Sequence, residues 1–279
     1  MRNDQISTDE LLECLGRSGY LLESRIVREL DSQGYFVEPN QMLRDPRTGK
    51  SREIDLVAEH YGYVREHRRL CVKTHFVAEV VNNRLPVVLL TQRPSSPNAD
   101  FESYVKFGTT PDPAPFYKEL NVYEDRSPPN EALFAQYCAL TTKKGEPREL
   151  MASHPDDLYS SLQKLSEYVE QELESFQSWG AETQTDIWRV FFWHPMLVVG
   201  GQLFAVSVND SGDPKVDEVN SAFLEFNWHQ GEDRKTTVIE VVQIAALYER
   251  MGNIVAWDSA LEVKLHALRS SSKDSNEDT

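Results

Sequence analysis

The alternation of apolar and polar residues changes along the chain and predicts a mixed α/β protein. Over residues 20–32 the apolar residues recur every three or four positions, as on one face of a helix. Residues 35–59 alternate instead on either side of a turn at 45–50, which predicts a β-hairpin. Apolar runs at 70–82 and 86–91 predict two further strands, the second buried on both faces.

The second half of the chain predicts two helices, then strands, then a last helix. Asn130 is a suitable N-cap for a helix through Thr141. A longer helix is expected from Pro155 to Trp179, with one apolar stripe and an acidic face that we expect to be solvated. Asp258 is expected to cap a final helix. The strands between them are expected at 187–193, 197–208, 222–229 and 236–248.

Proline content divides the chain. Residues 1–93 are expected to form the helix, hairpin and strands of a core unit. Residues 94–130 hold 7 of the 14 prolines and predict an extended surface excursion. Residues 131–269 add helices and strands that complete the same or a closely packed domain. The polar segment 270–279 predicts a disordered tail.

Composition predicts an ordinary soluble globular protein of 279 residues, and a cytoplasmic location is expected from its first residues. No apolar run approaches the roughly 20 residues of a membrane span, so no membrane partner is expected. The first ten residues lack the apolar core of a signal peptide. The three cysteines are scattered, which predicts reduced thiols and neither a disulfide framework nor a zinc site.

The net charge of −16 is unevenly distributed. Residues 1–93 carry 14 basic and 14 acidic side chains, so the acidic excess lies beyond them. This first part is therefore able to face a phosphate backbone, although an acidic surface without such a role is the simpler interpretation. The candidate nucleic-acid contacts are Lys50, Arg52, Arg68 and Arg69, with an ordinary solvated connection as the alternative.

Three acids close to apolar residues are the candidate functional side chains. Asp55 lies within the strand EIDLVA and Glu79 within FVAEVVN, while Glu23 lies within one turn of the apolar stripe of helix 20–32. Burying an unpaired carboxylate is costly, so acids in such runs are paired, neutralised or bound to a cation. Because Mg²⁺ prefers oxygen ligands, it is the candidate cofactor.

These segments resemble the PD-(D/E)xK, restriction-endonuclease-like superfamily. The resemblance rests on Glu23, SREIDLVA (51–58) and AEVVNNRLPVVLL (78–90), and it extends more loosely to about residue 268. It implies a mixed α/β sheet core with flanking helices, elaborated by C-terminal strands and helices. It also implies that Asp55 and Glu79 are catalytic metal ligands and that Glu23 is an auxiliary catalytic acid.

The chain departs from the family pattern at Val81, which occupies the position of the family's lysine. In the family that lysine orients the attacking water and stabilises charge that develops on the phosphate. Valine supplies neither function, and Asn82 is expected to point to the opposite face of the strand. Alternatively, Lys73 or Lys106 takes over the role of the missing lysine, although the spacing favours neither.

Three interpretations of function follow. The first is a catalytically degenerate pseudo-nuclease that binds nucleic acid, preferably DNA, or a protein partner. The second is an active Mg²⁺-dependent DNA nuclease with a relocated lysine. The third is a purely structural or regulatory interaction protein that has kept the fold. The sequence leaves the oligomeric state open.

Overall fold

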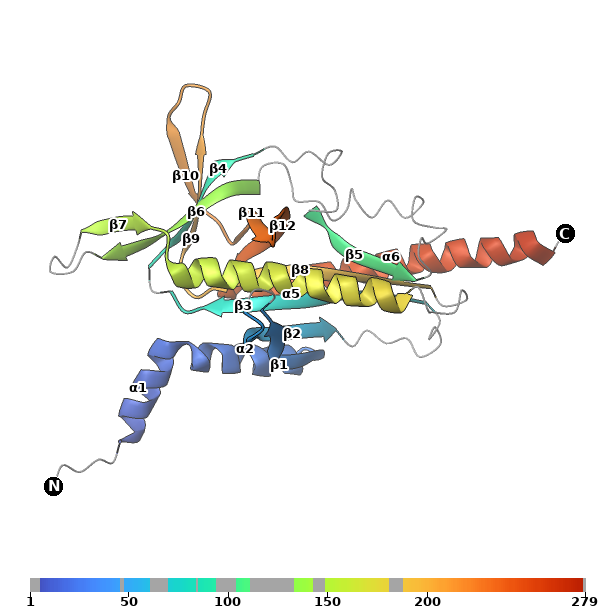
Figure 1. Cartoon of the computed structure of the whole chain (residues 1–279), viewed down its shortest axis with the longest axis horizontal. Coiled ribbons are helices and arrows are strands. Elements are labelled where there is room, and N and C mark those ends of the chain that lie inside the picture. Colours follow the sequence, from blue (N-terminus) through green and yellow to red (C-terminus); the bar gives the residue numbers. More distant parts are fainter. Residues whose placement is uncertain are drawn as a thin grey trace.

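The computed structural model describes residues 6–45, 48–60, 70–83, 85–93, 104–110, 133–142, 149–180 and 188–277. Within these ranges the chain forms one large mixed sheet of 12 strands with four helices (Figure 1). The mixed α/β class is therefore confirmed. The helices are α1 (Thr8–Ser18), α2 (Tyr20–Ser32), α5 (Asp156–Gly180) and α6 (Ile244–Glu277).

The strands follow the chain in twelve segments of 4 to 12 residues. They are β1 (Tyr35–Arg44), β2 (Ser51–His60), β3 (Leu70–Val81), β4 (Val87–Gln92), β5 (Lys106–Thr110), β6 (Leu133–Thr142), β7 (Leu150–Ser153), β8 (Trp188–Val199), β9 (Leu203–Val208), β10 (Pro214–Glu218), β11 (Ser221–Gln230) and β12 (Asp233–Gln243). Their order in the sheet is β1-β2-β3-β8-β12-β11-β6-β4-β9-β10, with β5 beside β8 and β7 beside β6.

Strands β1, β2 and β3 form an antiparallel meander at one edge of the sheet. Pro39 lies in the edge strand β1, where a missing N–H group is tolerated. Strand β3 then pairs in parallel with β8 along its whole length, and β8 pairs in parallel with β12. Pro195 falls between the part of β8 that pairs with β5 and the part that pairs with β12. One strand therefore runs through His194-Pro195, where the sequence predicts two.

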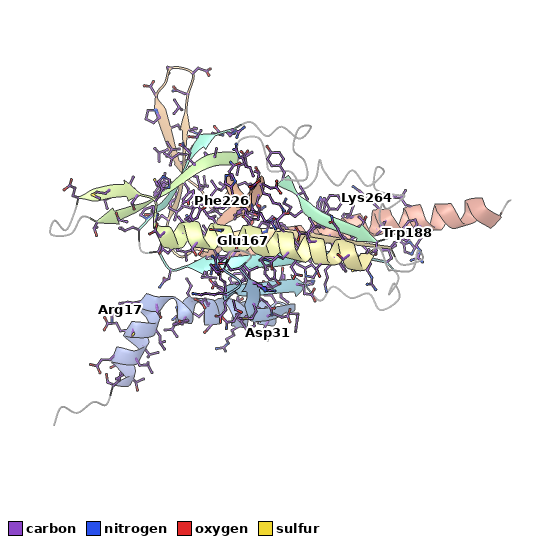
Figure 2. The ribbon with its side chains drawn as sticks, in the orientation of Figure 1. Arg17, Asp31, Glu167, Trp188, Phe226 and Lys264 are labelled. Carbon is purple, nitrogen blue, oxygen red and sulfur yellow. The ribbon has the colours of Figure 1, made fainter. Side chains whose placement is uncertain are left out.

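Helices cover both faces of the sheet. Helix α5 lies across one face and buries the predicted stripe against β3, β8 and β12; its buried members are Leu158, Leu162, Leu165, Val169 and Phe176. Helices α2 and α6 cover the other face, around Phe76 of β3. Figure 2 shows Glu167 of α5 over the middle of the molecule and Arg17 of α1 at its periphery.

Two of the predicted helices differ from the structure. Residues 133–142 are a strand and not a helix, because β6 pairs with β4 on one side and with β11 on the other. Pairing in a sheet overrides the weak helical preference of this segment. The final helix begins at Ile244, well before Asp258, and continues through Glu277 into the segment where disorder is predicted. Strand β5 lies inside the predicted surface excursion.

No helix among the described residues is long and apolar enough to cross a membrane.

Candidate active site

The three candidate acids come from α2, β2 and β3. Asp55 and Glu79 lie on antiparallel neighbours, and Asp55 Oδ2 accepts a hydrogen bond of 2.7 Å from the backbone N–H of Val80. Glu23 lies in the first turn of α2, and its pKa is raised by burial and by the charge of Asp55. The fold therefore brings residues 23, 55 and 79 into one electrostatically coupled group.

Gly19 caps the turn of α2 that carries Glu23, and its carbonyl accepts a 3.1 Å hydrogen bond from the backbone N–H of Glu23. Gly19 is both the C-cap of α1 and the N-cap of α2, and its φ is 94°. This left-handed conformation favours glycine, because a side chain there would be strained. Asn82, the residue directly after β3, donates a 2.8 Å hydrogen bond to the carbonyl of Gly16. The α1–α2 junction is thus attached to β3 beside the acids.

A lysine from α5 completes the group. Lys164 Nζ lies 2.5 Å from Glu79 Oε2 and donates a 3.0 Å hydrogen bond to the backbone carbonyl of Glu53. Glu53 is two residues before Asp55 on the same strand, so the lysine bridges β2 and β3. The side chains of Lys164 and Glu79 are only 18% and 2% exposed. The ammonium therefore lies in a largely water-excluded setting, where electrostatic interactions are strong.

The pKa values of the acids show their coupling. The pKa of Glu79 is raised to about 7. Burial and the charge of Asp55 raise it, and the charge and hydrogen bond of Lys164 offset part of that rise. Burial also raises the pKa of Asp55 and of Glu23, and the charge of Lys164 lowers both. Lys164 thus acts on all three acids. Its direct contact is with Glu79, and its charge favours the ionised form of each acid.

The position of the family's lysine remains apolar. Val81 packs against the core under α5, and Asn82 is committed to the α1–α2 junction, as its predicted orientation requires. The two suggested substitutes pair elsewhere: Lys73 with Glu59 at 2.6 Å, and Lys106 with a buried acid of α5. Within the described part of the chain, neither forms an ion pair with Asp55 or Glu79.

Two of the four candidate nucleic-acid contacts, Lys50 and Arg52, lie within the described residues. Arg52 forms ion pairs with Asp45 and Glu167 and is only 30% exposed. Lys50 is exposed at the end of the β1–β2 turn. Arg68 and Arg69 lie outside the described residues.

Sequence reasoning missed Lys164. A signal for it exists: Lys164 is the one basic residue in the 25-residue helix α5, whose polar positions are otherwise rich in acids. It lies off the apolar stripe, on a side of α5 that faces β2 and β3. Because a buried charge needs a partner, a lone cation on an otherwise acidic helix predicts an acid on the strands that the helix covers.

The site has the donor chemistry of a Mg²⁺ site. Glu79 Oε1 is buried and, among the described residues, accepts no hydrogen bond of ordinary geometry, although the Ser161 hydroxyl is close enough to lower the pKa of Glu79. No three His, Cys, Asp or Glu side chains in the described ranges are grouped closely enough to hold a metal by themselves. Mg²⁺ needs only one or two carboxylates, together with waters and a phosphate oxygen. Asp55 and Glu79 therefore fit it.

Comparisons of the chain with protein-family models, with curated protein sequences and with solved structures find no match.

Proposed function

We propose that this chain is a metal-dependent nuclease acting on DNA, with Glu23, Asp55, Glu79 and Lys164 as its active site. The observation that carries the proposal is the 2.5 Å contact between Lys164 Nζ and Glu79 Oε2. The absent lysine at Val81 favours a degenerate site only if no other ammonium reaches the acids. Lys164 supplies that ammonium from a different element.

Each side chain has a distinct role in the proposed site. Asp55 and Glu79 would hold Mg²⁺, which when bound supplies an activated water and neutralises charge on the phosphodiester. Three carboxylates beside one ammonium leave an excess of negative charge, which favours a divalent cation. Lys164 would supply positive charge to stabilise negative charge that develops on the phosphate, and half-buried Glu23 would accept a hydrogen bond from water.

A second candidate function is a non-catalytic DNA-binding protein. The same ion pair supports it, because an ammonium bound directly to Glu79 partly replaces the charge of a metal. In that case DNA affinity weakens as salt rises, without cleavage. The two candidates therefore differ in a single measurable property, the breakage of phosphodiester bonds.

The test is incubation of the purified protein with plasmid and single-stranded DNA in the presence of Mg²⁺ or Mn²⁺. We expect cleavage by the natural chain and its loss in Asp55→Asn, since this change removes a charged ligand while keeping the shape. Asp210→Asn, at an exposed hairpin turn, is the matched control and should cleave normally. Uncut DNA with every metal, together with salt-dependent binding, would support the second candidate instead.

A further inference from the structure

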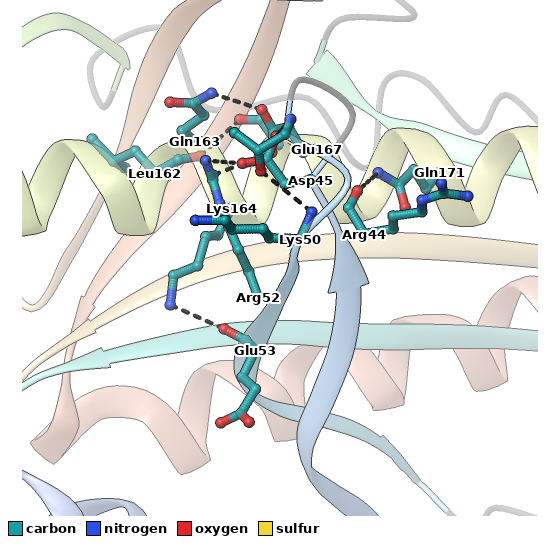
Figure 3. Close-up of polar contacts among 12 residues, drawn as sticks. Arg44, Asp45, Lys50, Arg52, Glu53, Leu162, Gln163, Lys164, Glu167 and Gln171 are labelled. Carbon is teal, nitrogen blue, oxygen red and sulfur yellow. Dashed lines mark hydrogen bonds and ion pairs between the residues drawn. The ribbon is translucent and has the colours of Figure 1, made fainter.

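A buried polar network joins α5 to the β1–β2 hairpin (Figure 3). Arg52 of β2 is its centre: Nη2 lies 2.5 Å from Asp45 Oδ2, and Nη1 lies 3.4 Å from Glu167 Oε2. Asp45 and Glu167 are each only 2% exposed. We call these three residues the Arg52 clamp.

The other oxygens of both carboxylates in the Arg52 clamp are also hydrogen-bonded. Asp45 Oδ1 accepts from the backbone N–H of Thr48 at 3.2 Å, and Glu167 Oε1 accepts from Gln163 Nε2 at 2.6 Å. A buried network whose members all have partners is rigid, because any shift leaves a carboxylate without one. The Arg52 clamp therefore holds α5 and β2 in one relative position.

That position is the one that delivers Lys164 to the acids. Glu167 is one helical turn beyond Lys164 on α5, and Arg52 is the residue before Glu53, whose carbonyl accepts from Lys164 Nζ. Rotation of α5 by one residue would turn the lysine by about 100° and carry it away from Glu79. Figure 3 shows the Arg52 guanidinium directed at Asp45 and Glu167, and the Lys164 ammonium directed at Glu53.

We propose that Arg52 is a positioning residue that fixes Lys164 against Glu79. The sequence instead predicts that Arg52 is a nucleic-acid contact. Both sides of its guanidinium are directed at protein carboxylates. The catalytic part of this inference rests on the proposed nuclease function. Its structural part, that Arg52 sets the position of Lys164, does not, and the two are tested separately.

The structural part is tested by the reactivity of Lys164. Reductive methylation followed by mass spectrometry measures the rate at which each lysine is modified. In the natural chain we expect Lys164 to react several-fold more slowly than Lys215, whose side chain is 69% exposed. In Arg52→Met the Lys164 rate should rise several-fold while the Lys215 rate stays constant. An unchanged Lys164 rate in the folded variant overturns the proposal.

If Arg52→Met does not fold, the same reactivity measurement is made on Arg52→Lys. Lysine keeps the charge but cannot bind two carboxylates in the fork geometry of arginine. The reactivity of Lys164 should then rise by a smaller factor. A Lys164 rate in Arg52→Lys equal to that of the natural chain also contradicts the proposal.

The catalytic part is tested by kinetics on DNA. Arg52→Lys should lower kcat by about 10-fold to 100-fold with KM nearly constant, because misplacing a catalytic group by about 1 Å has that effect. In a Lys164→Met background the same change should add little further loss, since the two residues act as a unit. A rise in KM at constant kcat would identify Arg52 as a DNA contact. Absence of cleavage by the natural chain would refute the nuclease function and leave the Lys164 reactivity result standing.

Discussion

At the scale of single residues, buried acids of this protein are paired with cations from other helices and strands. Lys164 meets Glu79 beneath α5, and Glu240 of β12 meets His194 and Arg250 on the other face of the sheet. Glu240 Oε2 lies 2.7 Å from His194 Nε2, and Oε1 lies 2.6 Å from Arg250 Nε. Such pairs specify which helix packs where, because an unpaired buried charge is costly.

Glu240 predicts how stability depends on pH. Burial raises its pKa, but His194 and Arg250 together lower the pKa to about 2, below the ordinary 4.5. A group with a lowered pKa stabilises the fold above its unfolded pKa and loses that contribution as pH falls. We therefore expect up to about 3 kcal/mol of stability to be lost between pH 5 and pH 2.

Urea unfolding at several pH values checks this prediction. Glu240→Gln should be less stable than the natural chain at pH 7, and its stability should fall less steeply below pH 5. Glu232→Gln, at an exposed turn, is the control and should follow the natural chain. Parallel pH curves for Glu240→Gln and the natural chain would show that Glu240 does not carry this dependence.

At the scale of elements, α5 differs from its predicted form. Its apolar stripe is buried as expected, yet Glu167 and Glu170 on the acidic face are buried too. Glu170 pairs with Lys106 of β5 and Lys235 of β12, and Glu167 pairs with Arg52 of β2. The helix therefore faces the sheet with both apolar and acidic residues, because it crosses strands that present cations to it.

The same packing makes Gly108 sensitive to substitution. Gly108 of β5 lies directly under α5, and a Cβ atom there would overlap the ring of Phe176. Gly108→Ala should lower the free energy of unfolding by about 1–3 kcal/mol through overpacking. Gly252→Ala in α6, where a Cβ meets nothing within 4 Å, should be neutral or stabilise by up to about 1 kcal/mol.

Thermal or denaturant unfolding of both glycine variants provides the comparison. Equal stability of Gly108→Ala and the natural chain would mean that α5 packs less closely on β5 than the structure shows. A loss of stability in Gly252→Ala would mean that the Cβ there meets a neighbour.

At the scale of the whole molecule, the sequence predicts the layers better than the site. The stripes of 20–32 and 155–179 and the alternation of 35–59 depend on local periodicity, which the structure keeps. The pairing of Glu79 with Lys164 does not depend on local periodicity, because Lys164 is 85 residues away and its placement depends on how α5 crosses the sheet. Strand β6 was missed for the same reason, since its neighbours β4 and β11 lie far away in sequence.

Helix α1 stands apart from the rest of the fold. It projects from the body in Figure 1 and has no buried residue, and it exposes Leu11 and Leu12. Removal of residues 1–15 should therefore change the free energy of unfolding by less than about 1 kcal/mol. Removal through Ser32 should unfold the protein, because α2 buries Ile26 and Leu30. Circular dichroism melting of the two truncations tests this, and a large loss of stability from the shorter truncation would contradict it.

The most direct test of the proposed active site is DNA cleavage by Lys164→Met in the presence of Mg²⁺ or Mn²⁺. Methionine keeps most of the length of the side chain and removes its charge, so Glu79 and Asp55 remain in place without their cation. We expect kcat to fall by about 100-fold or more, while Lys215→Met cleaves at the natural rate. Cleavage by Lys164→Met at the natural rate would contradict the assignment of Lys164 as the relocated lysine.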